Sequence, residues 1–368
     1  MASWGKAGHI DPFREKLRAG MLAHGLPAAF AEQIFEMIRG FGQYGFPESH
    51  AASFALLAYV SAWLKCHYPA AFAAALLNSQ PMGFYAPAQI VRDAQHHGVT
   101  VLPVDVNYSD WDCTLEEVGA HAIDSPDATR KRRIGMRLGL RMVHGLQETV
   151  ARAIVAERRA APFRSVFQLS RRAQVSRPIL ARLAAADAFS SLGLSRREAL
   201  WQVLSISEAL PLFAAVEEQE ETLPALSEIP LPKHVEMDYD TVGLSLKAHP
   251  IGLLRDELNA LKVITAKELL KAEDKQIVRI AGLVLVRQQP GTAKGTVFFT
   301  LEDETGTMNL VLWPAIWKRF RPVAFGAVAI LVEGRVEHAS NVTHVFPLKM
   351  EDLTATLGGM RAVSRDFH

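Results

Sequence analysis

Apolar side chains recur at helical spacing through the first hundred residues of the chain. Asp11 and Pro12 are typical of a helix start and Gly25 of a helix end, and a second helix is expected from Pro27 to Arg39. Two further apolar segments begin at prolines and run to residues 78 and 98. This pattern predicts that the first part of the chain is all-α.

The longest apolar run covers residues 51–64, within the stretch GFGQYGFPESHAASFALLAYVSAWLKCHYP. Its apolar positions lie on every side of the expected helix, so we predict a core helix that is buried nearly all round. The run is too short to cross a bilayer and ends at Lys65, which argues against a membrane span.

The loop before this helix has a composition suited to a nucleotide or a base. Its glycines permit positive φ angles and leave space beside the backbone, while Tyr44 and Phe46 supply aromatic faces.

Residues typical of turns recur in the next part of the chain. Between residues 99 and 115, prolines and short polar residues interrupt extended pieces, which predicts a connector packed on the helical part. The sequence VHGL at 143–146 predicts a tight turn between helices, with Gly145 at the turn and His144 beside it. In such a helix-hairpin-helix unit, backbone N–H groups and a helix N-terminus face a phosphate. The alternative is an ordinary αα-hairpin with a solvated basic face.

Charge is distributed unevenly, although the formal net charge is only +1. Residues 130–200 contain sixteen Arg and Lys against four acids, a net charge of +12, which favours a nucleic-acid partner. Residues 206–240 contain nine acids against Lys233, a net charge of −8, and are expected to form an acidic linker. Candidate DNA contacts of the basic region, besides the hairpin turn, are Arg130, Lys131, Arg132, Arg133, Arg141 and Arg152.

Strand signals dominate the last third of the chain, in the segments VRIAGLVLVRQQ, TVFFTLED, TMNLVLWP, AVAILVEGRVEH and NVTHVFPLKM. Five strands with a short helix between the third and the fourth are the order of an OB-fold, a small barrel whose open face binds single strands. For the aromatic residues Phe298 and Trp313, a place in the barrel core is an equally good interpretation. The candidate DNA contacts here are Arg279, Arg287, Lys294, Phe298, Trp313 and Arg335.

The whole pattern predicts a multidomain α + β chain. Its expected parts are an all-α domain with a connector (1–118), a helix-hairpin-helix domain (119–206), an acidic linker with short helices (207–274), a five-stranded OB-fold barrel (275–352) and a tail (353–368).

Candidate catalytic and metal-binding residues are few. Cys66 and Cys113 cannot build a disulfide framework or a four-ligand zinc site, which indicates a reducing, cytoplasmic location. Phosphoryl transfer with two metals needs closely placed carboxylates. The acidic pairs fall in turns or in the linker, so we expect no catalytic residue and no metal ligand among Asp110, Asp112, Asp238, Asp240 and Glu302 to Glu304.

The acidic linker contains one apolar patch, Leu210-Pro211-Leu212-Phe213. Leu210, Leu212 and Phe213 resemble the apolar part of a sliding-clamp ligand, but Ala209 stands where such peptides usually have glutamine. Packing of this patch on the preceding helix is the favoured interpretation. We therefore expect direct clamp binding to be weak or absent.

With these pieces in place, the chain resembles, over essentially all of its length, the C-terminal part of a bacterial family C DNA polymerase α subunit. The match is closest to the error-prone, DNA-damage-inducible branch called ImuC. Three segments carry the resemblance: AEQIFEMIRGFGQYGFPESHAASFALLAYVSAWLKCHYPAAFAAALLNSQPMGFYAPAQIVRDA, LPVDVNYSDWDCTLE and the terminal SRDFH.

The resemblance implies an error-prone, DNA-directed DNA polymerase used in translesion synthesis, of which this chain is the C-terminal portion. Tyr44, Phe46 and His50 match a fingers loop near the incoming nucleotide, although Pro47 stands where replicative members usually have a polar residue. The palm carboxylates and their Mg²⁺ lie outside such a portion, so the chain alone is expected to be inactive. The implied partners are primer–template DNA, single-stranded template, the catalytic N-terminal part, an ImuB-like protein and, through it, the sliding clamp. A standalone, non-catalytic DNA-binding adaptor is the alternative.

Overall fold

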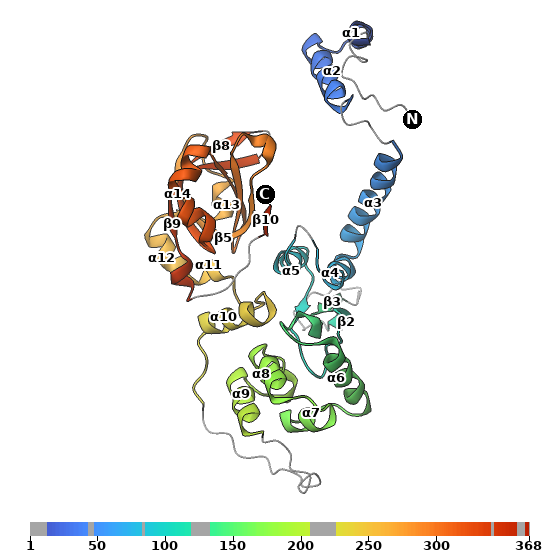
Figure 1. The fold of residues 1–368 in the computed structure, drawn as a ribbon, viewed down its shortest axis with the longest axis vertical. Helices are drawn as coiled ribbons and strands as arrows, with labels where there is room; N and C mark the ends of the chain where they lie inside the picture. Colours follow the sequence, from blue (N-terminus) through green and yellow to red (C-terminus); the bar gives the residue numbers. More distant parts are fainter. Residues whose placement is uncertain are drawn as a thin grey trace, which may run out of the picture. The chain divides into compact units, whose positions relative to one another are not determined.

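A computed structural model of the chain describes residues 13–42, 48–82, 85–118, 133–206, 226–339, 342–358 and 365–367 (Figure 1). The chain divides into two compact units, Met1–Tyr68 and Pro69–His368.

The first unit is helical, as expected. In α2, Ala31 and Phe35 are buried, and the guanidinium of Arg14 lies over the Phe35 ring. The expected burial of the apolar helix is not found, because its apolar side chains lie on every side and the other described helices of this unit do not cover them: Phe54 is 56% exposed and Tyr59 is 71% exposed. Its helices are α1 (Arg14–Ala23), α2 (Ala28–Gly42) and α3 (Glu48–His67).

No helix among the described residues is long and apolar enough to cross a membrane.

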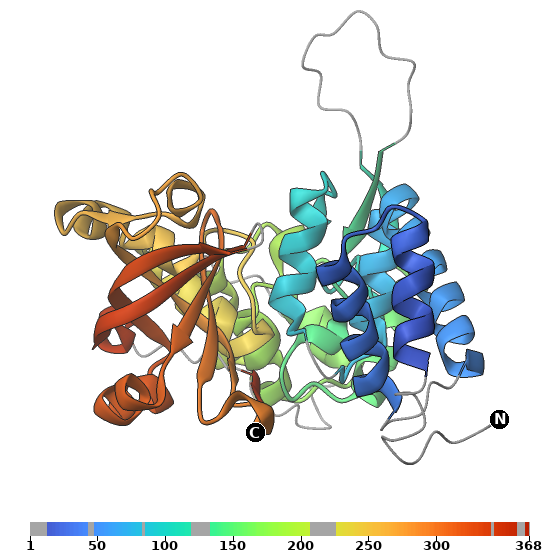
Figure 2. The same ribbon diagram turned by 90° about the horizontal axis from the view of Figure 1, so that it is seen from above.

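The second unit begins with two helices, α4 (Pro69–Asn78) and α5 (Pro87–His96), and a small sheet. The sheet has the order β1-β3-β2, from β1 (Val101–Leu102), β2 (Thr114–Val118) and β3 (Arg133–Arg137). Strands β2 and β3 run antiparallel, side by side (Figure 2). The basic segment expected to be helical therefore opens with a strand, in which Met136 is buried and Ile134 exposed. The expected domain boundary at residue 118 falls between these paired strands.

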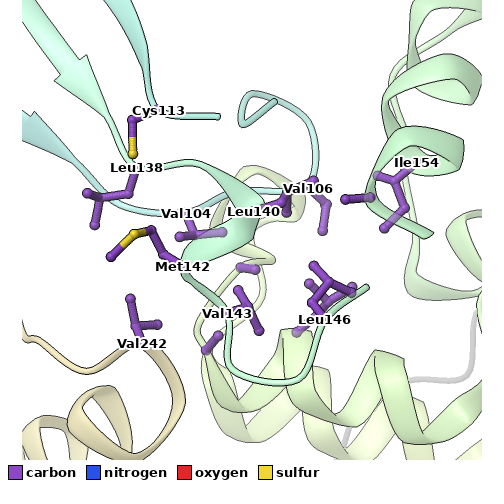
Figure 3. Packing of buried hydrophobic residues seen from close by; sticks show 14 of the residues in the cluster. Val104, Val106, Cys113, Leu138, Leu140, Met142, Val143, Leu146, Ile154 and Val242 are labelled. Atoms are coloured by element: carbon purple, nitrogen blue, oxygen red, sulfur yellow. The ribbon is translucent and has the colours of Figure 1, made fainter. Parts of the chain in front are cut away.

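The helix-hairpin-helix region follows directly on this sheet. Buried side chains from the connector and the hairpin, Val104, Leu140, Leu146 and Ile154 among them, form one continuous core (Figure 3). Its elements are η2 (Leu140–Met142), α6 (Glu148–Ala160), α7 (Val166–Arg172), α8 (Arg177–Ala185), η3 (Ser190–Leu192) and α9 (Arg196–Ser205).

A regular helix, α10 (Leu231–Val242), occupies the end of the expected acidic linker. Pro232 lies in its first turn, and Val235, Tyr239 and Val242 are buried at helical spacing. The many acids of this segment favoured a linker in the sequence, although its apolar residues recur at helical spacing. The elements between α10 and the barrel are α11 (Pro250–Leu253), α12 (Arg255–Ala260), β4 (Val263–Ile264) and α13 (Ala266–Leu269).

The last third of the chain is the expected OB-fold barrel. The sheet runs β5-β6-β7-β9-β8, and β8 pairs back onto β5, which closes it. Among these five strands all pairings are antiparallel except β7 with β9, and α14 (Pro314–Gly326) connects β7 to β8 (Figure 1). Ile280, Phe299, Leu310 and Val345 fill the interior. The elements are β5 (Ile277–Gln288), η5 (Gly291–Ala293), β6 (Val297–Asp303), β7 (Gly306–Leu312), α14 (Pro314–Gly326), β8 (Ala329–Ala339), β9 (Val342–Asp352), η6 (Thr354–Leu357) and β10 (Arg365–Phe367), which pairs with the end of β5.

Candidate nucleic-acid interface

The strand register lines up several candidate residues on the outer face of the barrel. Phe298 lies between the buried residues Val297 and Phe299, so it points outward. It pairs with Val311 on β7, and Phe346 on β9 pairs with Arg335 on β8. The β7–β9 ladder is in register at Leu310 and Val345, one residue before Val311 and Phe346. These four residues therefore form one row across four strands, in which Val311 is only 8% exposed.

Trp313 lies beside the middle of this row, two residues after Val311 along the chain, and is not part of the barrel core. It is 54% exposed, and its ring stacks on that of Phe346 with centroids 5.9 Å apart and planes 18° apart. Phe346 was missed from the sequence. Its alternation with Val345 marked it as outward-facing, but only the register shows that it meets Trp313 and Arg335.

The cations predicted on the barrel have different environments. Arg279 pairs with Glu333 at 2.7 Å. Arg287 is 7% exposed, and its guanidinium donates hydrogen bonds to the carbonyls of Ala324 and Ala327, so it fastens the end of α14 to β5. Arg335 and Lys294 are exposed, and Lys294 has left-handed backbone angles in the β5–β6 loop.

The hairpin turn contacts protein as well as solvent. The backbone N–H of His144 donates to the carbonyl of Thr241 at 2.8 Å, and its ring nitrogen Nδ1 lies 3.0 Å from the carbonyl of Asp240. Gly145 has φ +74°, and its carbonyl accepts a hydrogen bond from Arg182. One N–H expected to face a phosphate is thus bonded to the end of α10.

Many arginines of the basic region are used inside the fold. Arg141 donates to Asp112 and to the carbonyl of Asn78, and Arg152 pairs with Glu148 within α6. Acids outside the basic region pair with other arginines inside it. The net positive charge on its surface is therefore lower than the +12 counted from the sequence. Internal pairs of this kind are Arg137–Glu116, Arg158–Asp110 and Arg196–Asp238. In the described part of this region, exposed arginines without an acidic neighbour at ion-pair distance include Arg159, Arg164 and Arg177.

The remaining candidates lie at the edges of the described structure. His50 is exposed at the start of α3, with its ring 4.4 Å from that of Phe54. The side chain of Arg133 lies outside the described residues, as do Tyr44, Phe46, Arg130, Lys131, Arg132, Leu210, Leu212 and Phe213.

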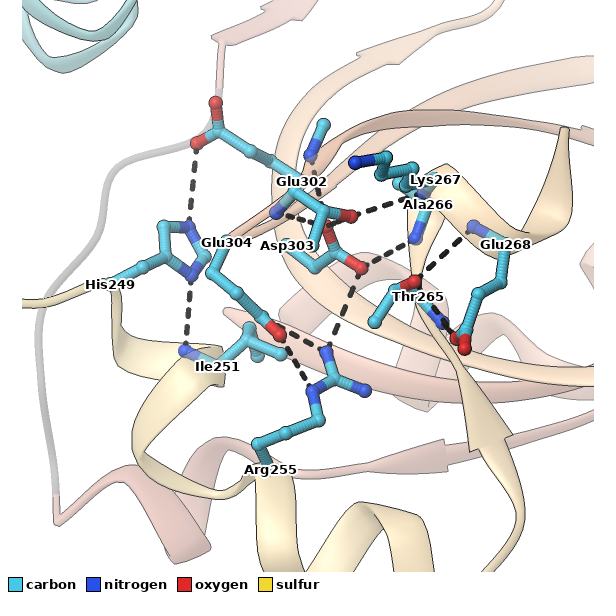
Figure 4. Close-up of polar contacts among 12 residues, drawn as sticks. His249, Ile251, Arg255, Thr265, Ala266, Lys267, Glu268, Glu302, Asp303 and Glu304 are labelled. Carbon is cyan, nitrogen blue, oxygen red and sulfur yellow. Dashed lines mark hydrogen bonds and ion pairs between the residues drawn. The ribbon is translucent and has the colours of Figure 1, made fainter. Parts of the chain in front are cut away.

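Basic side chains contact the acidic turn, which comprises Glu302 and Asp303 at the end of β6 and Glu304 after it (Figure 4). Arg255 makes a two-pronged contact with Glu304, at 2.6 and 2.9 Å. Glu302 faces Arg92 at 3.2 Å and His249 at 3.7 Å. Burial lowers the pKa of His249, and the positive charge of Arg92 lowers it further, against the opposing effect of Glu302. These contacts hold α5, the N-cap residue of α11 and the first residue of α12 against the barrel.

Comparison with known proteins agrees with this architecture. The helix-hairpin-helix motif family matches residues 98–199, and the OB-fold nucleic acid binding domain family matches residues 278–353. Error-prone DNA polymerase of Rhodopirellula baltica is 50% identical over 100% of this chain, and those of Sinorhizobium medicae and Burkholderia pseudomallei are 46% and 48% identical over 100% of it. The chain spans 32%, 34% and 34% of these relatives, about a third of their length. Over its whole length, the chain is therefore a homologue of the C-terminal part of bacterial error-prone DNA polymerases.

Proposed function

We propose that the chain is the DNA-binding, C-terminal portion of an error-prone polymerase that copies damaged templates. The observation that carries this proposal is the outward-facing set of Phe298, Phe346 and Arg335 on an OB-fold barrel homologous to polymerase sequence. Aromatic faces stack on bases without regard to sequence, and a neighbouring cation holds the backbone. The barrel would hold single-stranded template, while exposed arginines of the helix-hairpin-helix region, such as Arg159 and Arg164, contact duplex phosphates.

The chemistry is assigned to the rest of the polymerase. Two divalent metals, Mg²⁺ in the proposed complete enzyme, need carboxylates that converge on one point. The carboxylates of Glu302 and Glu304 are already contacted by Arg92, His249 and Arg255. No described group of three or more His, Cys, Asp or Glu side chains is arranged to hold a metal ion. These residues do not fit a metal pair.

The exposed apolar surface of α3 supports a protein partner. Leu56, Leu57 and Tyr59 are 65%, 58% and 71% exposed. The only acid in α3 is Glu48, and its one lysine is Lys65 in the last turn. Exposed apolar surface of this extent marks interaction sites. We propose that α3 packs against the catalytic part, since about two thirds of the relatives' length lies outside this chain. The resemblance further supports recruitment to the sliding clamp through an ImuB-like protein.

Fluorescence anisotropy with labelled single-stranded and duplex DNA tests the proposal. Phe298→Ala should weaken single-strand binding by about 1–3 kcal/mol and leave duplex binding unchanged, because only unpaired bases stack on the ring. Tyr85→Ala, which removes another exposed aromatic ring, is the matched control and should change neither. Equal effects on both DNA forms, or none, would contradict the assignment of the barrel face.

A further inference from the structure

Helix α14 has two different faces. Ile316, Trp317, Phe320, Val323 and Ala324 pack against the barrel core. The opposite face is exposed and carries three cations, Lys318, Arg319 and Arg321. Lys318 and Arg321 are three residues apart and lie on either side of a kink in the helix, at Phe320 (φ −104°, ψ 15°).

The charges on this outward face are unopposed. The helix, PAIWKRFRPVAFG, contains no acid. In the described structure, neither Lys318 nor Arg321 has an acidic side chain at ion-pair distance, and Arg319 lies over the ring of Phe320. Arg279 and Arg287, by contrast, are engaged by Glu333 and by backbone carbonyls. The outward face of α14 is thus a positive surface that the fold itself does not use.

This positive surface starts at the aromatic pair. Trp313 is the N-cap residue of α14, and its carbonyl accepts the first helical hydrogen bond, from Trp317. Helix α14 lies beside β7 and β9, the strands that carry Val311 and Phe346 (Figure 1). A strand of nucleic acid that crosses the outward row and stacks on Trp313 therefore meets Lys318 and Arg321 next.

We propose that Trp313, Phe346 and the outward face of α14 form a binding site for single-stranded DNA that continues the path of the template beyond the barrel strands. A base stacks on Trp313, whose ring Phe346 supports from the other side. Lys318 and Arg321 contact successive phosphates, and Arg319 adds charge. This site rests on the proposed function, because it extends the single-strand interface of the same barrel.

The test is the salt dependence of binding of the full chain to a labelled oligo-dT strand. Each phosphate contact contributes about 0.7 to the slope of log affinity against log salt for single strands. Lys318→Ala with Arg321→Ala should therefore reduce the slope by about 1.4 in magnitude. Lys267→Ala with Lys271→Ala removes the same charge from exposed sites elsewhere and should leave the slope unchanged. Both double variants change exposed side chains only, and thermal melting verifies that they fold.

A second variant tests the ring. Trp313→Ala should lower affinity for oligo-dT by roughly 5- to 150-fold, the loss of one stacked base. An unchanged slope in the Lys318/Arg321 variant, with wild-type chain binding oligo-dT, overturns this site and leaves the proposed function standing. Failure of the wild-type chain to bind oligo-dT at all overturns both.

Discussion

The guanidinium of Arg182 occupies the space that a side chain on residue 145 would need. A Cβ atom at Gly145 would lie 2.2 Å from Nη1 of Arg182, which donates a hydrogen bond of 2.6 Å to the Gly145 carbonyl. The glycine also has φ +74°, a conformation that other residues adopt at a cost of about 1–2 kcal/mol. The hairpin turn is therefore fixed both by its own backbone and by α8.

Replacing this glycine should destabilise the fold by more than backbone strain alone. We expect Gly145→Ala to cost about 2–3 kcal/mol in the free energy of unfolding, because strain adds to the loss of the Arg182 hydrogen bond. Gly193→Ala is the matched control: φ is +70° there, and nothing lies within 4 Å of the new Cβ. Urea unfolding should show a cost about 1 kcal/mol smaller for the control. Equal costs would mean that Arg182 moves aside freely.

The buried ion pair between Arg196 and Asp238 should contribute most of the stability that holds α10 against α9. The Arg196 side chain is fully buried, and Asp238 also accepts a hydrogen bond from Ser245. Asp238→Ala leaves a guanidinium in the interior without its main partner, which should cost about 3–5 kcal/mol. Arg152→Ala, which breaks an exposed pair within α6, should cost about 0.5 kcal/mol or less. Comparable losses in the two variants, measured by thermal melting, would refute this ranking.

The lowered pKa of His249 predicts a loss of stability in acid. The fold favours the neutral ring, so its contribution is complete above the unfolded pKa of about 6.5 and is lost as the pH falls below that value. One such proton changes the unfolding free energy by at most about 1.4 kcal/mol per pH unit. His249→Asn keeps an acceptor for the Ile251 N–H but does not titrate, so its stability should fall less between neutral and mildly acidic pH. His97→Asn, at an exposed ring, is the control, and an identical profile for wild type and His249→Asn would contradict the prediction.

Substitution on α3 should not affect the isolated chain. Leu56 is 65% exposed, so Leu56→Ala should change the unfolding free energy by no more than about 0.5 kcal/mol. Leu180→Ala, in the fully buried core of α8, should cost about 2–5 kcal/mol. A large loss at Leu56 would show that α3 is covered within the chain and would remove the reason for placing the catalytic part there.

The sequence patterns predicted the helices and strands better than they predicted the contacts between side chains. The periodicity of apolar residues was enough for the N-terminal helices, and the order of five strands and one helix was enough for the barrel. The strand Arg133–Arg137 was missed because its pairing partners are distant in sequence. Arg141 and Arg287 contact acids and carbonyl oxygens that are distant in sequence and come near only in the folded chain. Counting charges along the sequence therefore overestimated the number of cations on the surface. Phe346 entered the candidate site only through the strand register and its ring contact with Trp313.

Primer extension tests the central claim most directly, that this chain binds DNA for a polymerase whose chemistry lies elsewhere. Two preparations are compared: the purified chain, and the Rhodopirellula baltica relative with its matching third replaced by this chain. We predict that the chain alone leaves a primer unextended with Mg²⁺ and all four nucleotides, whereas the chimera extends it as the template directs. Template-directed extension by the chain alone, or a folded chimera that binds primer–template DNA no better than the relative lacking this third, would contradict the account.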